Sequence, residues 1–270
     1  MLDAKDVLAP FRELLGKSQG NVLLGLRLVE RIERFPSPTA EEQDVIHRVS
    51  LMGPAVDMAQ GKRDFKAWIL RNGLEEVHAS VRVTLDRLFV YKTIEQAIQA
   101  DPSQDISHLE DALKTRIIRL DFPTILQEVN SMLTKPLTLT DHVRTINNAR
   151  NCLVHSHGVV VRRFCNNAAK DRLSLKLRKM ILFYFKDGRR TVIDRKDHPG
   201  VENAPIHTAA VDYDIEFSLG AQVDLSLQQF IDVLMTCFFL GAEIETHLNV
   251  PAPIFQLNMR IYYQIRKGKS

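Results

Sequence analysis

Apolar residues recur at helical spacing through most of the first 157 residues. The segments 4–15 and 21–35 show this pattern first, and the longest predicted helix, 74–100, follows a break that Asn72 and Gly73 predict. Further helix starts are predicted by capping-box pairs, whose side chains satisfy first-turn amides: Thr39 with Glu42, Ser107 with Glu110, and Ser226 with Gln229. Most of the chain is therefore predicted to be helical.

The pattern changes after Gly158. Between residues 158 and 220 the chain has short β-branched and aromatic runs, VVVRRF, LKLRKMILFYF, RRTVI and DYDIEFSL, separated by turn residues. Helical spacing then returns from Ser226. We predict a mainly α protein, a multi-helix bundle with a small antiparallel β insertion at about 158–220 before the last core helix. An N-terminal helical region would cover 1–73 and the bundle 74–270.

Composition excludes several classes of protein. The 270 residues include 36 basic and 33 acidic side chains, and the three cysteines have neither zinc-ligand spacing nor an even count. The N-terminus lacks a secretory signal pattern. The apolar run 230–242 is interrupted by Asp232 and is too short for a membrane span, so we interpret it as a buried core helix. These features predict a cytoplasmic protein without a membrane segment, metal or cofactor.

The stretch NNARNCLVHSHG, residues 147–158, ends an amphipathic helix that is predicted to begin with Thr140 as its N-cap. Gly158 is typical of a residue just beyond a helix C-terminus. The predicted buried stripe has an arginine, Arg150, in its middle and consists of Val143, Ile146, Ala149, Leu153 and Val154. Asn151 stands four residues before His155, close enough to orient the imidazole. Arg150 and His155, however, point about 140° apart on an ideal helix.

The sequence Arg150-Asn151-Cys152-Leu153-Val154-His155, followed by Gly158, resembles the motif of the HEPN superfamily (higher eukaryotes and prokaryotes nucleotide-binding). Members are helical domains, and many are metal-independent endoribonucleases of toxin and antiviral abortive-infection systems. The resemblance covers residues 141–158 and implies that His155 is the acid–base group, that Arg150 binds the scissile phosphate, and that Asn151 orients His155 or the phosphate. His157 is a possible auxiliary residue. The products would carry a 2′,3′-cyclic phosphate.

The resemblance also implies partners. Members of the family commonly pair two motif helices across a two-fold axis, and one straight helix cannot aim both Arg150 and His155 at one phosphate. We therefore predict a homodimer in which both residues of both chains line a shared cleft. A helix that loosens near Ser156 would be the alternative. RNA is the expected substrate, and a toxin-like role implies an antitoxin or sensor protein as a further partner.

Structural interpretations of the same residues remain open. Arg150 could form a salt bridge with Asp86, Glu95 or Asp232, and His155 and His157 could simply cap the helix. The loose arginine-to-histidine spacing is not specific, because Arg71 and His78 show it as well. The alternative functions are a non-catalytic HEPN-like module that binds RNA, a nucleotide or a protein, and an unrelated helical scaffold.

Charge gives a second indication of RNA. Residues 162–196 hold twelve basic and three acidic side chains, a net charge of +9 against +3 for the whole chain. The residues predicted to contact RNA are Arg162, Arg163, Arg178, Lys179, Arg189 and Arg190. Aromatic residues at 183–185 could stack on bases if they are exposed. The alternative is a solvated hairpin whose aromatic rings lie in the core.

Overall fold

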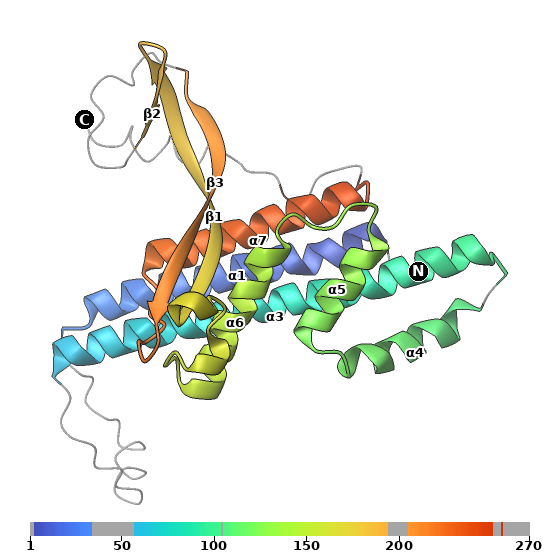
Figure 1. Cartoon of the computed structure of the whole chain (residues 1–270), viewed down its shortest axis with the longest axis horizontal. Helices are drawn as coiled ribbons and strands as arrows, with labels where there is room; N and C mark the ends of the chain where they lie inside the picture. Colours follow the sequence, from blue (N-terminus) through green and yellow to red (C-terminus); the bar gives the residue numbers. More distant parts are fainter. Residues whose placement is uncertain (1–2, 34–56, 104, 194–204, 251–254, 256–270) are drawn as a thin grey trace, which may run out of the picture.

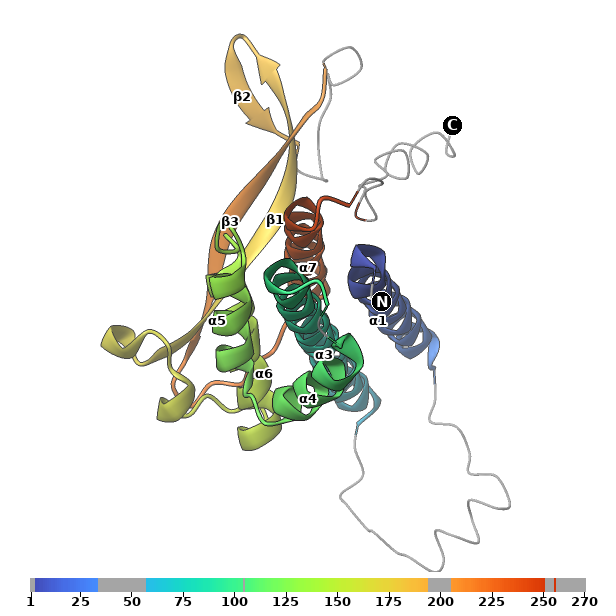
Figure 2. The ribbon, with the colours of Figure 1, turned by 90° about the vertical axis from the view of Figure 1, so that its right-hand side faces the viewer.

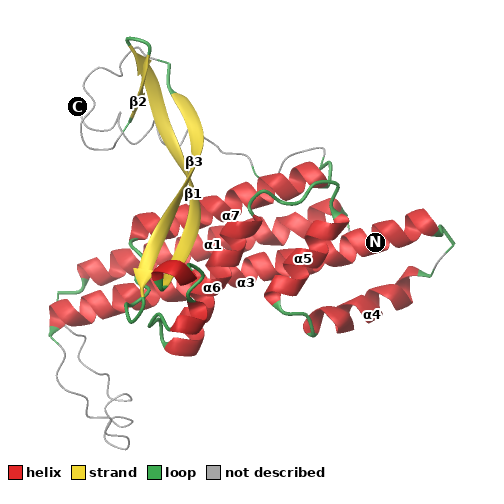
Figure 3. Cartoon of the chain, viewed as in Figure 1, coloured by secondary structure: helices red, strands yellow, loops and turns green. Residues whose placement is uncertain are grey.

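The computed structural model describes residues 3–33, 57–103, 105–193, 205–250 and 255. These residues form six α-helices and one three-stranded antiparallel sheet (Figure 1, Figure 3), which confirms the prediction of a mainly helical protein with a small sheet. The helices are α1 (Ala4–Arg31), α3 (Met58–Ala100), α4 (Ile106–Ile118), α5 (Phe122–Met132), α6 (Thr140–Ser156) and α7 (Leu227–His247). The strands are β1 (Arg172–Lys186), β2 (Arg189–Val192) and β3 (His207–Ser218), and the turns η1 (Arg162–Phe164) and η2 (Ala168–Lys170) precede them.

Helix α3 is continuous over 43 residues, so the predicted break at Asn72 and Gly73 is wrong. Gly73 serves packing instead: a Cβ at this position would lie 2.5 Å from Val22 Cγ2 of α1 and 2.8 Å from Phe230 Cε2 of α7. A glycine therefore lets three helices approach closely, and its weak helix propensity is overridden by tertiary packing. The boundary predicted at residue 73 lies inside this helix.

Local capping signals account for several other helix ends. Asp121 caps α5 by accepting a hydrogen bond from the Thr124 amide at 2.9 Å, and Pro123 occupies the first turn. The predicted capping box of Ser226 and Gln229 is confirmed at the start of α7. Helix α4 already begins at Ile106, so the capping box predicted at Ser107 is wrong. The capping box at Thr39 lies outside the described residues.

Helices α1, α3 and α7 lie side by side lengthwise, and α5 and α6 cross α3 on another side (Figure 1, Figure 2). Their buried side chains form one hydrophobic cluster, whose largest fully buried members include Phe11, Phe89 and Phe230. By length and composition alone α7 could cross a membrane, and half of that apolar window is buried inside the protein. Its polar residues Asp232 and Glu245 are themselves buried.

The sheet has the order β2-β1-β3. β1 pairs with β3 along most of its length, whereas β2 pairs only with residues 183–186 of β1 through a turn at Asp187 and Gly188, both with positive φ. The run VVVRRF, predicted as a strand, makes only an isolated bridge from Val159 to Gln222. It turns into η1 because the Phe164 amide bonds back to the Val161 carbonyl at 2.9 Å.

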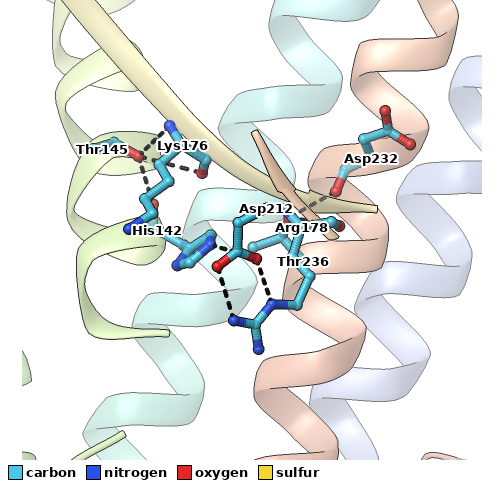
Figure 4. Close-up of polar contacts among 7 residues, drawn as sticks. All are labelled: His142, Thr145, Lys176, Arg178, Asp212, Asp232 and Thr236. Carbon is cyan, nitrogen blue, oxygen red and sulfur yellow. Dashed lines mark hydrogen bonds and ion pairs between the residues drawn. The ribbon is translucent and has the colours of Figure 1, made fainter. Parts of the chain in front are cut away.

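The edge of β1 that faces away from β3 has no neighbouring strand over its first half, yet its backbone groups are paired. Asn166 bonds both the amide and the carbonyl of Ser174, at 2.6 and 2.7 Å. The Thr145 hydroxyl of α6 accepts from the Lys176 amide at 2.9 Å, and the Thr236 hydroxyl of α7 accepts from the Arg178 amide at 2.9 Å (Figure 4). Side chains of two helices thus replace a strand and attach β1 to the bundle.

Beyond these attachments the sheet leaves the helices. Figures 1 and 2 show the distal half of β1, with β2 and the start of β3, projecting past the bundle. We call residues 179–193 together with 207–211 the β-arm.

Thr236→Val is expected to lower the free energy of unfolding by about 1–3 kcal/mol, because valine keeps the volume but leaves the Arg178 amide of β1 unpaired. Thr246→Val on the same helix is the matched control, since the exposed Thr246 bonds only its own helix at Ala242. Its effect is expected to stay within about 0.5 kcal/mol. Urea unfolding measures both, and equal effects would show that the edge contact adds no stability.

Candidate active site

Helix α6 places the candidate catalytic residues at its C-terminal end. The predicted N-cap is wrong by one residue, because Leu139 occupies that position without a side-chain cap and Thr140 begins the helix. The predicted C-terminus is confirmed: the helix ends at Ser156, and His157 and Gly158 follow with φ of 52° and 82°. A Cβ at Gly158 would lie 2.4 Å from Gln222 Nε2, so packing as well as φ requires glycine.

Arg150 is half-buried and has no ion pair with any described carboxylate. The three acids that could have paired with it are bonded elsewhere: Asp86 to Arg82, Glu95 to Lys92, and Asp232 to the Tyr213 hydroxyl. Its Nη1 donates to Asn151 Oδ1 at 3.2 Å. The structural salt bridge considered for Arg150 is therefore not formed, and Asn151 contacts Arg150 in place of His155.

A buried histidine lies at the contact between α3 and α6, near Arg150. His78 Nε2 is 2.9 Å from Asn147 Oδ1, and its ring lies 4.7 Å from that of Phe122. Burial, and then the positive charge of Arg150, lower the pKa of His78 to about 4. His78 is therefore neutral at pH 7 and donates from Nε2 to Asn147. The sequence singled out His78 only through its spacing from Arg71, which carried no information about this contact.

His155 is exposed and lies beside η1. Its ring is 6.5 Å from that of Phe164 with the planes 20° apart, and its carbonyl accepts from Arg163 Nη2 at 3.2 Å. The Arg163 guanidinium also lies 4.6 Å from the centre of the Phe164 ring. Two of the predicted residues, His155 and Arg163, are thus brought together by a contact that the sequence pattern did not show.

The structure does not bring Arg150 and His155 of one chain together. Because α6 stays regular through Ser156, the two side chains leave the helix about 140° apart. Val154 is predicted to be buried but is 37% exposed. Around the helix axis it points between the directions of Arg150 and His155. His157 is exposed and is the C-cap of α6, because its amide donates to the Cys152 carbonyl. Its own carbonyl accepts from Gln222 Nε2 at 2.9 Å.

Arg178, a predicted RNA contact, is bonded within the protein. Its Nε and Nη2 donate to the two oxygens of Asp212 at 2.6 and 3.0 Å (Figure 4). His142 of α6 is buried with Nε2 3.2 Å from Asp212 Oδ1. The hydrogen bonds from Arg178 lower the pKa of Asp212 to about 2, whereas burial lowers the pKa of His142. This cluster connects α6 with β1 and β3.

The acids of β3 account for much of the basic charge. Asp212, Asp214 and Glu216 alternate along β3, opposite residues 174–178 of β1. Glu216 bonds Arg172 and lies 3.3 Å from Lys170 Nζ. Of the predicted RNA contacts, Arg178 and Arg162 have acidic partners, Arg162 at 3.5 Å from Asp171. Those with no ion pair to a described acid are Arg163, Lys179, Arg189 and Arg190.

No group of three or more His, Cys, Asp or Glu residues that could hold a metal occurs in the described part of the chain. Comparisons with models of known protein families, with curated proteins and with solved structures found no match to this chain. The resemblance to HEPN proteins therefore rests on the sequence motif of residues 150–158 alone.

His78→Gln is expected to make the protein less sensitive to mild acid. Because the pKa of His78 falls from 6.5 to about 4 on folding, its contribution is fully present above pH 6.5 and is lost as the pH falls towards 4. Glutamine keeps a hydrogen-bond donor for Asn147 but takes up no proton. Urea unfolding between pH 7 and pH 4 is expected to show a loss about 2–3 kcal/mol smaller in the variant. His108→Gln, in an exposed residue of α4, is the control that is expected to follow wild type.

Proposed function

We propose that this protein is a metal-independent endoribonuclease of the HEPN kind, whose site is formed by Arg150, Asn151 and His155. The observation that carries the proposal is Arg150: a half-buried guanidinium with no described carboxylate partner, bonded to Asn151, one and a half turns before an exposed histidine. Such a cation can bind an anion from outside the chain, and phosphate fits the planar guanidinium.

The chemistry is RNA transesterification. A histidine removes the proton of a 2′-hydroxyl, the 2′ oxygen bonds to the adjacent phosphorus, and the bond from phosphorus to the 5′ oxygen breaks. A proton delivered to that oxygen releases a 5′-hydroxyl, and the other product keeps a 2′,3′-cyclic phosphate. Arg150 neutralises the charge that develops on the phosphate oxygens, while Asn151 holds its guanidinium. His155 acts as the acid–base group.

A second copy of the chain completes the site in this proposal. Viewed down the axis of α6, four side chains point outward in succession within an arc of about 140°: Arg150, Val154, Asn151 and His155. Val154 at 37% exposure and Val159 at 38% give this end of the helix an apolar surface that a partner can cover. Two such helices related by a two-fold axis place Arg150 of one chain beside His155 of the other.

The biological role that fits such an enzyme is a toxin or an antiviral defence protein in the cytoplasm, held inactive by an antitoxin or a sensor until RNA cleavage is needed. Uncontrolled cleavage of cellular RNA would arrest the cell that makes it, so a controlling partner is part of the proposal.

His155→Ala and Arg150→Ala are each expected to reduce cleavage of total RNA at least about 100-fold in the presence of EDTA. Gel analysis of the fragments, with detection of 2′,3′-cyclic phosphate ends, measures the effect. The matched controls are His108→Ala, at another exposed histidine, and Arg144→Ala, at an arginine of α6 that pairs with Asp141. His157→Ala shows whether that residue assists.

The outcomes separate the two functional classes. Cleavage by wild type that EDTA abolishes, or that His155→Ala retains in full, contradicts the proposed mechanism. RNA binding without any cleavage by wild type would favour the non-catalytic HEPN-like binding module.

The composite site predicts complementation between inactive chains. In a mixture of Arg150→Ala and His155→Ala proteins, the mixed dimer keeps one Arg150 and one His155 on different chains, so cleavage is expected to reappear. Sedimentation at micromolar concentration is expected to show a dimer, and Val154→Glu to shift it towards monomer. A monomeric wild type, or a dimer whose mixed form stays inactive, would exclude the shared cleft.

A further inference from the structure

The β-arm carries aromatic side chains on one exposed face. Phe183, Phe185 and His207 contact one another in pairs, with ring centres 5.4 to 5.6 Å apart. Phe185 is 54% exposed, and Val192, directly opposite Phe183 on β2, is 46% exposed. The same side of β1 is buried nearer its start, at Leu173 and Leu177. The face therefore changes from core to surface where the strand passes beyond the helices.

The charge of the β-arm differs from that of the sheet's base. The Arg190 guanidinium lies 4.1 Å from the centre of the Phe183 ring, and Arg189 and Lys186 pair across the same turn. The acids of β3 all lie at residues 212–216, next to the base of β1, and the described arm has one acid, Asp187. Basic side chains that have no acidic partner among the described residues thus lie around exposed rings at the tip.

We propose that the tip of the β-arm binds single-stranded RNA, with unpaired bases stacking on Phe185 and its neighbours and phosphates bound by Arg189 and Arg190. Exposed rings beside cations are the combination that binds single strands, because each base offers a flat face and each nucleotide a negative charge. A duplex hides its base faces. The excess of unpaired positive charge favours a polyanion over an apolar protein surface.

The arm is separate from the candidate active site. His155 lies beside η1, at the base of the sheet, whereas Phe185 is thirteen residues along β1 from Arg172. At about 3.3 Å per residue the tip is roughly 40 Å from that base. The arm therefore acts as an anchor that selects unpaired RNA. The proposal rests on the proposed function only for the choice of RNA as the polyanion.

Binding is tested in the full-length chain carrying His155→Ala, so that cleavage does not interfere. The probe is a fluorescein-labelled oligouridylate of about twelve nucleotides, followed by fluorescence anisotropy, with an RNA duplex of equal length beside it. Phe185→Ala is expected to raise the Kd for the single strand about fivefold or more. The control is Phe65→Ala, an aromatic residue of α3 that is 46% exposed.

Replacing Arg189 and Arg190 together by glutamine is expected to reduce the slope of log K against log salt by about 1.4, because fewer counterions are released. Arg172→Gln with Lys170→Gln is the matched control with the same change of charge, since both residues face Glu216. It is expected to change the slope less. Thermal unfolding of each variant checks that the fold is kept.

The proposal is overturned if Phe185→Ala and Phe65→Ala bind the oligouridylate equally well, or if the duplex binds as tightly as the single strand. The proposal is also overturned if Phe185→Ala leaves RNA binding unchanged but abolishes binding to a protein partner, because the arm would then recognise protein. If wild type cleaves no RNA but Phe185→Ala weakens binding of the oligouridylate, the RNA-binding role of the β-arm is supported and the endoribonuclease proposal fails. If wild type cleaves RNA and Phe185→Ala has no effect on binding of the oligouridylate, the endoribonuclease proposal is supported and the RNA-binding role of the β-arm is refuted.

Discussion

The pairing of one open strand edge is the constraint on which the rest of the structure depends. β1 is long, and over its first half only β3 lies beside it. The other edge is paired by side chains, with Thr145 from α6 and Thr236 from α7. An unpaired buried amide is costly, so these contacts position the sheet against both helices. Since α6 also carries the candidate catalytic residues, the same contacts position the candidate active site relative to the β-arm.

Arg150 differs from Arg82 and Arg178 in its bonding partner. Arg82 and Arg178 each bond a carboxylate, whereas Arg150 bonds only an asparagine amide among the described residues. Its positive charge also contributes to the low pKa of the buried His78. A half-buried charge that has no counter-charge among the described residues costs stability, and in the proposed function an RNA phosphate supplies that counter-charge.

Charge on the sheet is divided along its length. At the base, acids of β3 face basic residues of β1 and link the two strands. At the tip, Arg189 and Arg190 lie beside aromatic residues and have no such partner in the part of the chain that the structure describes. One strand pair therefore combines a part that holds the fold together with a part that is proposed to bind RNA. The distance between tip and base separates RNA capture from cleavage in the function proposed here.

The amino-acid sequence by itself determined the mainly helical architecture, the three strands that formed, the start of α7 and the end of α6, because periodicity, capping pairs and the glycine at Gly158 act over a few residues. It also located Arg150, Asn151 and His155, the residues of the proposed active site. Only the tertiary structure decided that α3 continues through Gly73, that Val154 is exposed and that Arg178 is bonded to Asp212. Each of these outcomes depends on groups far apart in the chain. Asp212 is 34 residues from Arg178, and Gly73 packs closely against Val22 of α1 and Phe230 of α7. A local pattern carries no information about such partners, because packing and charge pairing depend on which surfaces meet after folding.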